Sequence, residues 1–170
     1  VFKDFQDEIG KEANIAKWDY VIVPGNHDLD FSMDVPFRNM VIKDTLEHGA
    51  VSRIEFEDEA LKPQEAFWNF YSELTSCEYP NRISYKKVFA INQHSSLEFH
   101  CYNTALLSTI DEQPQSLLIP ENNFLEYNDT QKERNDIVIS VFHHKTGWLT
   151  TRGDRNNRHL FCEHIQKQSH

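Results

Sequence analysis

Cysteine is scarce in this sequence, and its spacing excludes the common cysteine-based frameworks. The 170 residues include three cysteines, Cys77, Cys101 and Cys162, none of which belongs to a C-x-x-C pair. An odd and widely spaced set predicts neither a network of disulfides nor a zinc ribbon. A reducing compartment is the simplest environment for such a chain, so we expect a cytoplasmic protein.

Long apolar runs and an excess of positive charge are absent as well. No apolar run approaches the roughly 18 residues that a membrane span needs, and the acidic start VFKDFQDEIGKE is unlike a signal peptide. The formal net charge of −10 argues against strong electrostatic binding to nucleic acid or to an anionic membrane. An acidic protein can still bind phosphate groups through metal ions, because the ions supply the local positive charge.

The remaining composition is that of a globular protein in which helices and strands alternate. Hydrophobic residues make up 39% and aromatic residues 12% of the chain, enough for one domain with a core. Helical periodicity predicts four helices, over residues 1–16, 36–48, 57–75 and 157–168. Apolar runs predict four strands, over residues 20–23, 85–92, 97–103 and 136–142. The interleaved order predicts a layered α/β protein. We treat it as a single domain, residues 1–170, with the mostly helical stretch 29–82 as a candidate cap beside the sheet.

The predicted strands differ in the burial that their patterns indicate. Residues 20–23 and 136–142 lack polar alternation, which is typical of strands covered on both faces. In the second strand of the predicted central hairpin, apolar residues alternate with Glu98, His100 and Tyr102. That alternation predicts one face that is exposed or only lightly covered.

Two of the predicted strands run directly into clusters of polar residues. Gly25-Asn26-His27-Asp28 follows the first strand, and His143-His144 follows the last. Ligands of α/β proteins tend to bind beyond the carboxyl ends of strands. The two clusters are far apart in sequence, so only the fold could bring them together at one edge of a sheet.

The residue types in the first cluster suit a cation and a proton donor. Gly25 permits a close backbone approach, and Asn26 offers a neutral amide oxygen to a hard cation. His27 can donate a proton near neutral pH, and Asp28 could orient its imidazole. The alternative is a plain turn, because Asn, Gly and Asp are common turn residues and a histidine beside them is unremarkable.

The segments VIVPGNHD and ISVFHHKTGWL resemble two blocks of the calcineurin-like metallophosphoesterase family. The resemblance implies an α/β/β/α sandwich of two sheets flanked by helices, and hydrolysis of phosphate mono- or diesters with the help of two divalent metal ions. Mn²⁺ is the expected metal because amide, carboxylate and imidazole ligands mix, with Fe, Zn²⁺ or Ni²⁺ as alternatives. The expected partner is a phosphorylated substrate, a class that includes nucleotides and nucleic acids. No association with a membrane is expected.

The resemblance also implies a role for each matching residue. Asn26 and His143 correspond to ligands of one metal ion. His27 corresponds to the histidine that contacts the phosphate and protonates the leaving oxygen, and Asp28 to the acid that holds it. His144 and Lys145 are candidate substrate contacts, although a lysine in a loop is more often only solvated.

Three further blocks of that family are missing from these 170 residues. The family also uses an Asp-x-His block, a Gly-Asp block and a Gly-His-x-His block, and the Gly153-Asp154 pair falls on the wrong side of His143 to serve as the second. We therefore expect a central piece of a longer metallophosphoesterase, incomplete at both ends and inactive alone. The alternative from another functional class is a non-catalytic binding or sensing module with the same fold.

The other histidines carry weaker signals. His159, Cys162 and His164 lie close together on the last predicted helix, but no fourth zinc ligand is evident near them. His100 and Cys101 lie in the predicted hairpin. We interpret these residues as structural or surface residues.

Overall fold

The computed structural model describes residues 2–13, 18–33, 36–50, 54–76, 78, 81–125, 137–151 and 156–168. Its helices are α1 (Phe2–Ala13), α2 (Pro36–His48), α3 (Ile54–Leu61), α4 (Glu65–Thr75) and α5 (Asn157–Gln168). Its strands are β1 (Ser84–Asn92), β2 (Ser95–Tyr102) and β3 (Ile137–Val141). Short 3-10 turns include η1 (Asn26–Asp28), η3 (Lys62–Gln64) and η6 (Thr146–Trp148). The protein is therefore of the mixed α/β class.

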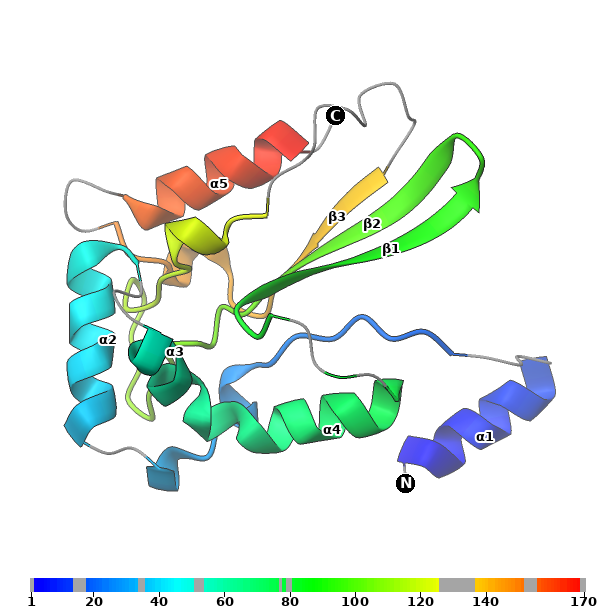
Figure 1. The fold of residues 1–170 in the computed structure, drawn as a ribbon, viewed down its shortest axis with the longest axis horizontal. Helices are drawn as coiled ribbons and strands as arrows, with labels where there is room; N and C mark the ends of the chain where they lie inside the picture. Colours follow the sequence, from blue (N-terminus) through cyan, green and yellow to red (C-terminus); the bar gives the residue numbers. More distant parts are fainter. Residues whose placement is uncertain are drawn as a thin grey trace.

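The three strands form one mixed sheet in the order β1-β2-β3 (Figure 1). β1 and β2 are an antiparallel hairpin, whereas β2 and β3 run parallel, with Cys101 opposite Val141. The carboxyl ends of β2 and β3 therefore meet at the same edge of the sheet. That edge is where polar side chains from distant parts of the sequence can meet.

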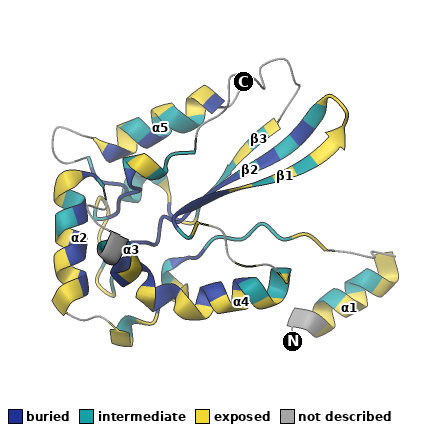
Figure 2. Ribbon diagram, viewed as in Figure 1, coloured by how far each residue is buried: buried dark blue, intermediate teal, exposed yellow. Residues whose placement is uncertain are grey.

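Helices cover both faces of the sheet at its inner end, where β1 begins and β2 ends (Figure 1). On one face the ring of Tyr102 packs against Phe161 of α5, with 5.0 Å between the ring centroids. On the other face Tyr85 packs against Tyr71 of α4, at 5.9 Å. At the outer end of the sheet, β1 is largely exposed and β3 partly exposed, whereas β2 between them is buried or half-buried (Figure 2).

The main core lies where α2, α3 and α5 meet the inner end of the sheet and the segment that follows β2. Its fully buried members include Val41, Leu61, Tyr102 and Phe161. Helices from the first half of the chain and elements from the second half thus bury the same apolar surface.

Five predicted elements, three helices and the two strands of the hairpin, appear close to their predicted positions. α2 begins at Pro36 and is followed by Gly49, whose φ of 74° is the left-handed conformation that glycine adopts readily. The predicted hairpin is β1 and β2, and the predicted helix at 157–168 is α5. The predicted helix at 1–16 is α1, of which residues 14–16 lie outside the described residues.

The single helix predicted over residues 57–75 is wrong. The chain forms two helices, and Pro63 lies in the 3-10 turn between them. Proline has no N–H to donate and disfavours helical geometry in the residue before it, so the helix ends at Leu61 and restarts at Glu65.

The strand predicted at 20–23 is also wrong, because these residues do not join the sheet. The carbonyl groups of Tyr20 and Ile22 accept hydrogen bonds from the side chains of Lys87 and Tyr85, respectively. The segment therefore runs alongside β1 in the opposite direction, and these contacts are made by side chains of β1 instead of a backbone ladder.

Two predictions about burial are reversed by the structure. β3 was expected to be buried, but it is an edge strand with Ile137 and Ile139 exposed by 55% and 40%. The polar face of β2 was expected to be exposed, but Glu98 and His100 are 1% and 0% exposed. The reason is that the end of α5 covers this face with a polar residue, Gln168, that hydrogen-bonds to His100.

No helix in the described ranges is long and apolar enough to cross a membrane.

Candidate functional site

Three segments meet beyond the carboxyl ends of the parallel strands. Asn103-Thr104 follows β2, His143-His144 follows β3, and Gly25–Asp28 follows the segment that runs alongside β1. This convergence is the one that the sequence predicted for the first and last clusters. Its third member, Thr104, was not predicted.

Asn26 and His143 are in direct contact. The Oδ1 atom of Asn26 lies 3.2 Å from the Nε2 atom of His143, and the imidazole of His143 is exposed to solvent. Two residues that are 117 positions apart in the sequence therefore present an amide oxygen and a ring nitrogen to the same point.

Gly25 provides the space that the His143 ring occupies. A Cβ atom at position 25 would lie 2.8 Å from both Cε1 and Nδ1 of His143, closer than such atoms pack. The φ of Gly25 is −104°, which any residue can adopt, so the requirement for glycine is steric and not conformational. The ring of His143 is held against the backbone of the turn that carries Asn26.

Asp28 stabilises that turn. Its Oδ2 atom accepts a hydrogen bond from the Gly25 N–H at 2.8 Å, and its own N–H donates to the Gly25 carbonyl at 3.1 Å. His27 is exposed, and in the described part of the chain no hydrogen bond or ion pair joins it to Asp28. The predicted contact between the two side chains is therefore absent, and Asp28 instead fixes the backbone that positions His27.

The two neighbours of His143 that were predicted to contact substrate differ in exposure. His144 is 7% exposed, and its ring is turned into the protein toward Thr104 and Glu112. Burial is the largest influence on the pKa of His144 and lowers it, whereas the nearby Glu112 carboxylate opposes that shift. Lys145 is exposed at the start of the η6 turn. Of this pair, only Lys145 offers a side chain to solvent.

Thr104 and Glu112 are site residues that sequence reasoning missed. The Oγ1 atom of Thr104 lies 3.1 Å from Nδ1 of His144 and accepts a hydrogen bond from the His144 N–H at 3.0 Å. Glu112 Oε1 lies 3.3 Å from His144 Nε2, close enough for an ion pair, although the two groups are not aligned as a hydrogen bond. The available signal was that Thr104 follows β2 just as His143 follows β3.

The donor atoms of Asn26 and His143 suit a single shared metal ion. Two ligand atoms about 2.1 Å from one ion lie about 3.0–3.4 Å apart when the bond angle is about 90–110°. The observed 3.2 Å falls in this range, and an ion bound to both atoms would take the place of the Nε2 proton that lies between them in the hydrogen bond. Among the described residues, no group of three or more His, Cys, Asp or Glu side chains is arranged to hold a metal.

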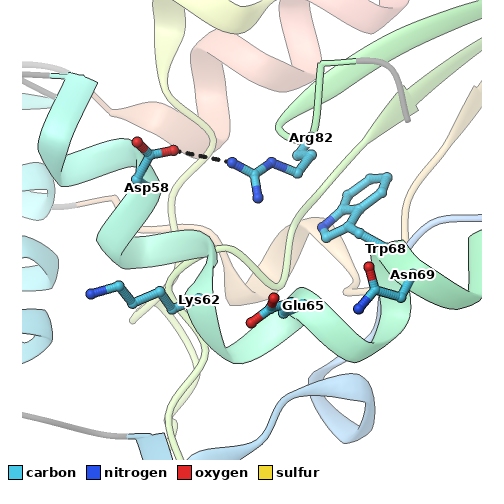
Figure 3. A pocket seen from close by; sticks show the side chains of 6 residues that line it. All are labelled: Asp58, Lys62, Glu65, Trp68, Asn69 and Arg82. Carbon is cyan, nitrogen blue, oxygen red and sulfur yellow. Dashed lines mark hydrogen bonds and ion pairs between the residues drawn. The ribbon is translucent and has the colours of Figure 1, made fainter. Parts of the chain in front are cut away.

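A pocket elsewhere on the surface does not include these residues. It has a volume of about 230 Å³ and lies among α3, α4 and Arg82, which is paired with Asp58 at 3.1 Å (Figure 3). Trp68 lines it but is only 1% exposed, and its Nε1–H donates to Gln64. The indole is thus part of the core, and the pocket has no feature that links it to the Asn26–His143 pair.

Comparisons of the chain with models of known protein families, with curated proteins and with solved structures find no match. Any functional assignment therefore depends on the residues and their geometry.

Proposed function

We propose that this chain forms part of the active site of a metal-dependent phosphoesterase of the calcineurin-like type. The observation that carries the proposal is the contact between Asn26 and His143 over the backbone of Gly25. The two residues match the two sequence blocks of that family, and their donor atoms are spaced as ligands of one ion are spaced.

The proposal assigns the metal and the proton transfer to different residues. Divalent ions at this site would supply positive charge for a phosphate group and activate water for attack on phosphorus. Asn26 and His143 would hold one such ion, and Mn²⁺ suits their oxygen and nitrogen donors. His27 is exposed one residue away from Asn26 and is free to protonate the departing oxygen. Asp28 would act through the turn, by fixing the backbone before His27.

The proposal requires ligands beyond these two. A firmly held catalytic metal usually has at least three protein ligands, and the resemblance assigns the others to the Asp-x-His, Gly-Asp and Gly-His-x-His blocks. It likewise makes the three-stranded sheet one part of a two-sheet sandwich. The 170 residues alone are therefore expected to bind Mn²⁺ weakly and to lack turnover.

The test is Mn²⁺-dependent hydrolysis of nitrophenyl phosphate and bis-nitrophenyl phosphate by the intact protein that carries this sequence. We expect turnover that His143→Ala reduces by more than about 100-fold, because loss of a residue that only orients a ligand already costs about 10–100-fold. His159→Ala is the matched control, since His159 is an exposed histidine on α5, and it should leave turnover unchanged.

Two results would contradict the proposal. Equal losses from His143→Ala and His159→Ala would separate the activity from the Asn26–His143 pair. Tight binding of a phosphate ester without hydrolysis in Mn²⁺, Zn²⁺, Ni²⁺ or Fe²⁺ would favour the alternative, a non-catalytic binding or sensing module.

A further inference from the structure

Thr104 connects the two parallel strands at their carboxyl ends. It is 1% exposed, and its single hydroxyl oxygen contacts both the main chain and the ring of His144. Because its oxygen accepts the His144 N–H, its own proton is available to the Nδ1 atom of the ring. The peptide that joins His143 to His144 is thereby fixed relative to β2.

Glu112 restrains the other side of the same ring. If Thr104 donates to Nδ1, the proton of a neutral His144 ring resides on Nε2, which faces the Glu112 carboxylate at 3.3 Å. The opposite tautomer would direct a lone pair at that carboxylate and would be repelled by it. The side chains of Glu112 and His144 are 8% and 6% exposed, so this attraction operates away from bulk solvent.

The His144 ring in turn bounds the space that the His143 ring can occupy. The two imidazoles meet edge to face, with 4.8 Å between centroids and an angle of 88°. The backbone of Gly25 contacts the His143 ring as well. The direction of His143 Nε2 toward Asn26 therefore depends on where His144 is held.

We propose that Thr104 and Glu112 are positioning residues for His143, acting through the main chain and ring of His144. The positioning is a property of the fold by itself, and only its consequence for metal binding rests on the proposed function.

The support behind Thr104 includes a hydrogen-bonded pair of buried side chains. Its neighbour Asn103 exchanges two hydrogen bonds with Gln64, at 2.6 Å and 3.2 Å, and also donates to the carbonyl of Arg82 at 2.9 Å. The side chains of Asn103 and Gln64 are in the core. Thr104 is therefore held in place from the opposite side of the sheet end, as a positioning residue must be.

The test compares Thr104→Val, which removes the hydroxyl but keeps the shape, with Thr104→Ser, which keeps the hydroxyl. Thr45→Val is the matched control, because Thr45 is also buried and its hydroxyl has no hydrogen-bond partner within the described residues. In the full chain, nitrogen NMR would report the tautomers of His143 and His144, and hydrogen exchange would report protection of the His144 N–H. We expect Thr104→Val to change both tautomers and to lower that protection by at least about tenfold, with the fold retained. Thr104→Ser and Thr45→Val should resemble the parent chain.

Glu112→Gln gives a second, independent arm, because it keeps the size of the side chain and removes its charge. We expect it to shift the His144 tautomer equilibrium and to leave the His144 N–H protected. Mn²⁺ titration of the intact protein should show a loss of affinity of about 10–100-fold for Thr104→Val, as for other residues that orient a metal ligand. Unchanged NMR signals of His143 in both variants would overturn the positioning role. Changed signals without Mn²⁺ binding by the parent protein would contradict the proposed function while supporting the positioning role.

Discussion

Two histidine pairs of this protein occupy contrasting surroundings. The outer pair, His143 and His144, lies at the carboxyl end of β3, with the His143 ring exposed beside an asparagine and a glycine. The inner pair, His100 and His164, lies between β2 and α5. The His100 side chain is fully buried, whereas His164 is partly buried. Both pairs come from elements that the sequence predicted, but they face different neighbours.

The difference lies in what satisfies the ring nitrogens. In the inner pair, His100 contacts Gln168 at 2.9 Å and Glu98 at 3.3 Å, and His164 contacts Tyr102 at 3.1 Å. These nitrogens are committed to the protein itself. His143 uses one nitrogen toward Asn26 at a surface where a ligand could intervene. Substitutions at His143 and at the turn beside it should therefore change activity, and those at the inner pair should change stability.

Among the substitutions that test this contrast, the largest effect is expected at His27. We predict that His27→Ala in the intact protein lowers kcat by about 10²–10⁴-fold, the usual contribution of a general acid. The melting temperature should not change, because the side chain is exposed and makes no hydrogen bond to its neighbour Asp28. Steady-state kinetics and Mn²⁺ content would be measured on the same preparation.

The leaving group provides the control for His27. Nitrophenolate leaves without protonation, so its ester should lose less rate than an ester of a simple alcohol. A variant that loses Mn²⁺ together with its activity would identify His27 as a ligand, contrary to the role proposed here.

A smaller effect is expected from Gly25→Ala. The new Cβ would lie 2.8 Å from the His143 ring and would push it away from Asn26. We predict a loss of Mn²⁺ affinity of about 10–100-fold and a stability cost of about 1–3 kcal/mol from overpacking. Gly147→Ala is the control, because nothing lies within 4 Å of its Cβ position. Equal Mn²⁺ affinities of the two variants would show that the contact between Gly25 and His143 does not position the His143 ring.

The parts of the structure that sequence predicted are those fixed by local signals. Pro36 and Gly49 bound α2 through backbone preferences that depend on no distant residue. The Asn26–His143 contact was predictable because both residues follow apolar runs. The buried faces of strands were less predictable: the alternation in β2 predicts an exposed face for His100, but its ring is buried against Gln168, 68 positions away, and against Glu98.

Long-range pairing explains the remaining differences. The role of Thr104 depends on β2 and β3 being parallel neighbours, which no local pattern reveals. Residues 20–23 have the composition of a strand, yet their carbonyls bond to side chains of β1. The apolar composition of β3 predicts a strand but does not predict its burial, because composition does not show how many neighbouring strands it has.

The inner pair should contribute to how stability depends on pH. Burial is the largest influence on His100 and lowers its pKa below the ordinary 6.5, with Lys86 acting in the same direction and Glu98 opposing both. His164 is shifted in the same direction, again mainly by burial. The unfolded chain then binds more protons than the folded chain just below pH 6.5, so stability is full above that pH and falls as the pH decreases.

Urea unfolding between pH 5 and pH 7.5 would measure this dependence. Each such histidine contributes a slope of up to about 1.4 kcal/mol per pH unit, equivalent to about tenfold in the folding equilibrium. We predict that His100→Gln flattens the slope by up to that amount, while His94→Gln, at an exposed position in the β1–β2 turn, leaves it unchanged. A steeper slope in His100→Gln would mean that the buried ring is charged in the folded protein.

The smallest expected effect is at Lys145, which lies in the outer loop, the loop that follows His143 and His144. Its side chain is exposed, and its carbonyl accepts the Trp148 N–H at 2.9 Å, a contact that alanine preserves. An exposed charge contributes up to about 1 kcal/mol, so Lys145→Ala should raise KM for a phosphate ester by at most about fivefold and leave kcat unchanged. The increase should disappear at high ionic strength, where the interaction is screened, and Lys43→Ala on the exposed side of α2 should have no effect. A loss of kcat above about tenfold would instead place Lys145 on the phosphate in the transition state, and the outer loop would then contribute a catalytic charge in addition to His143.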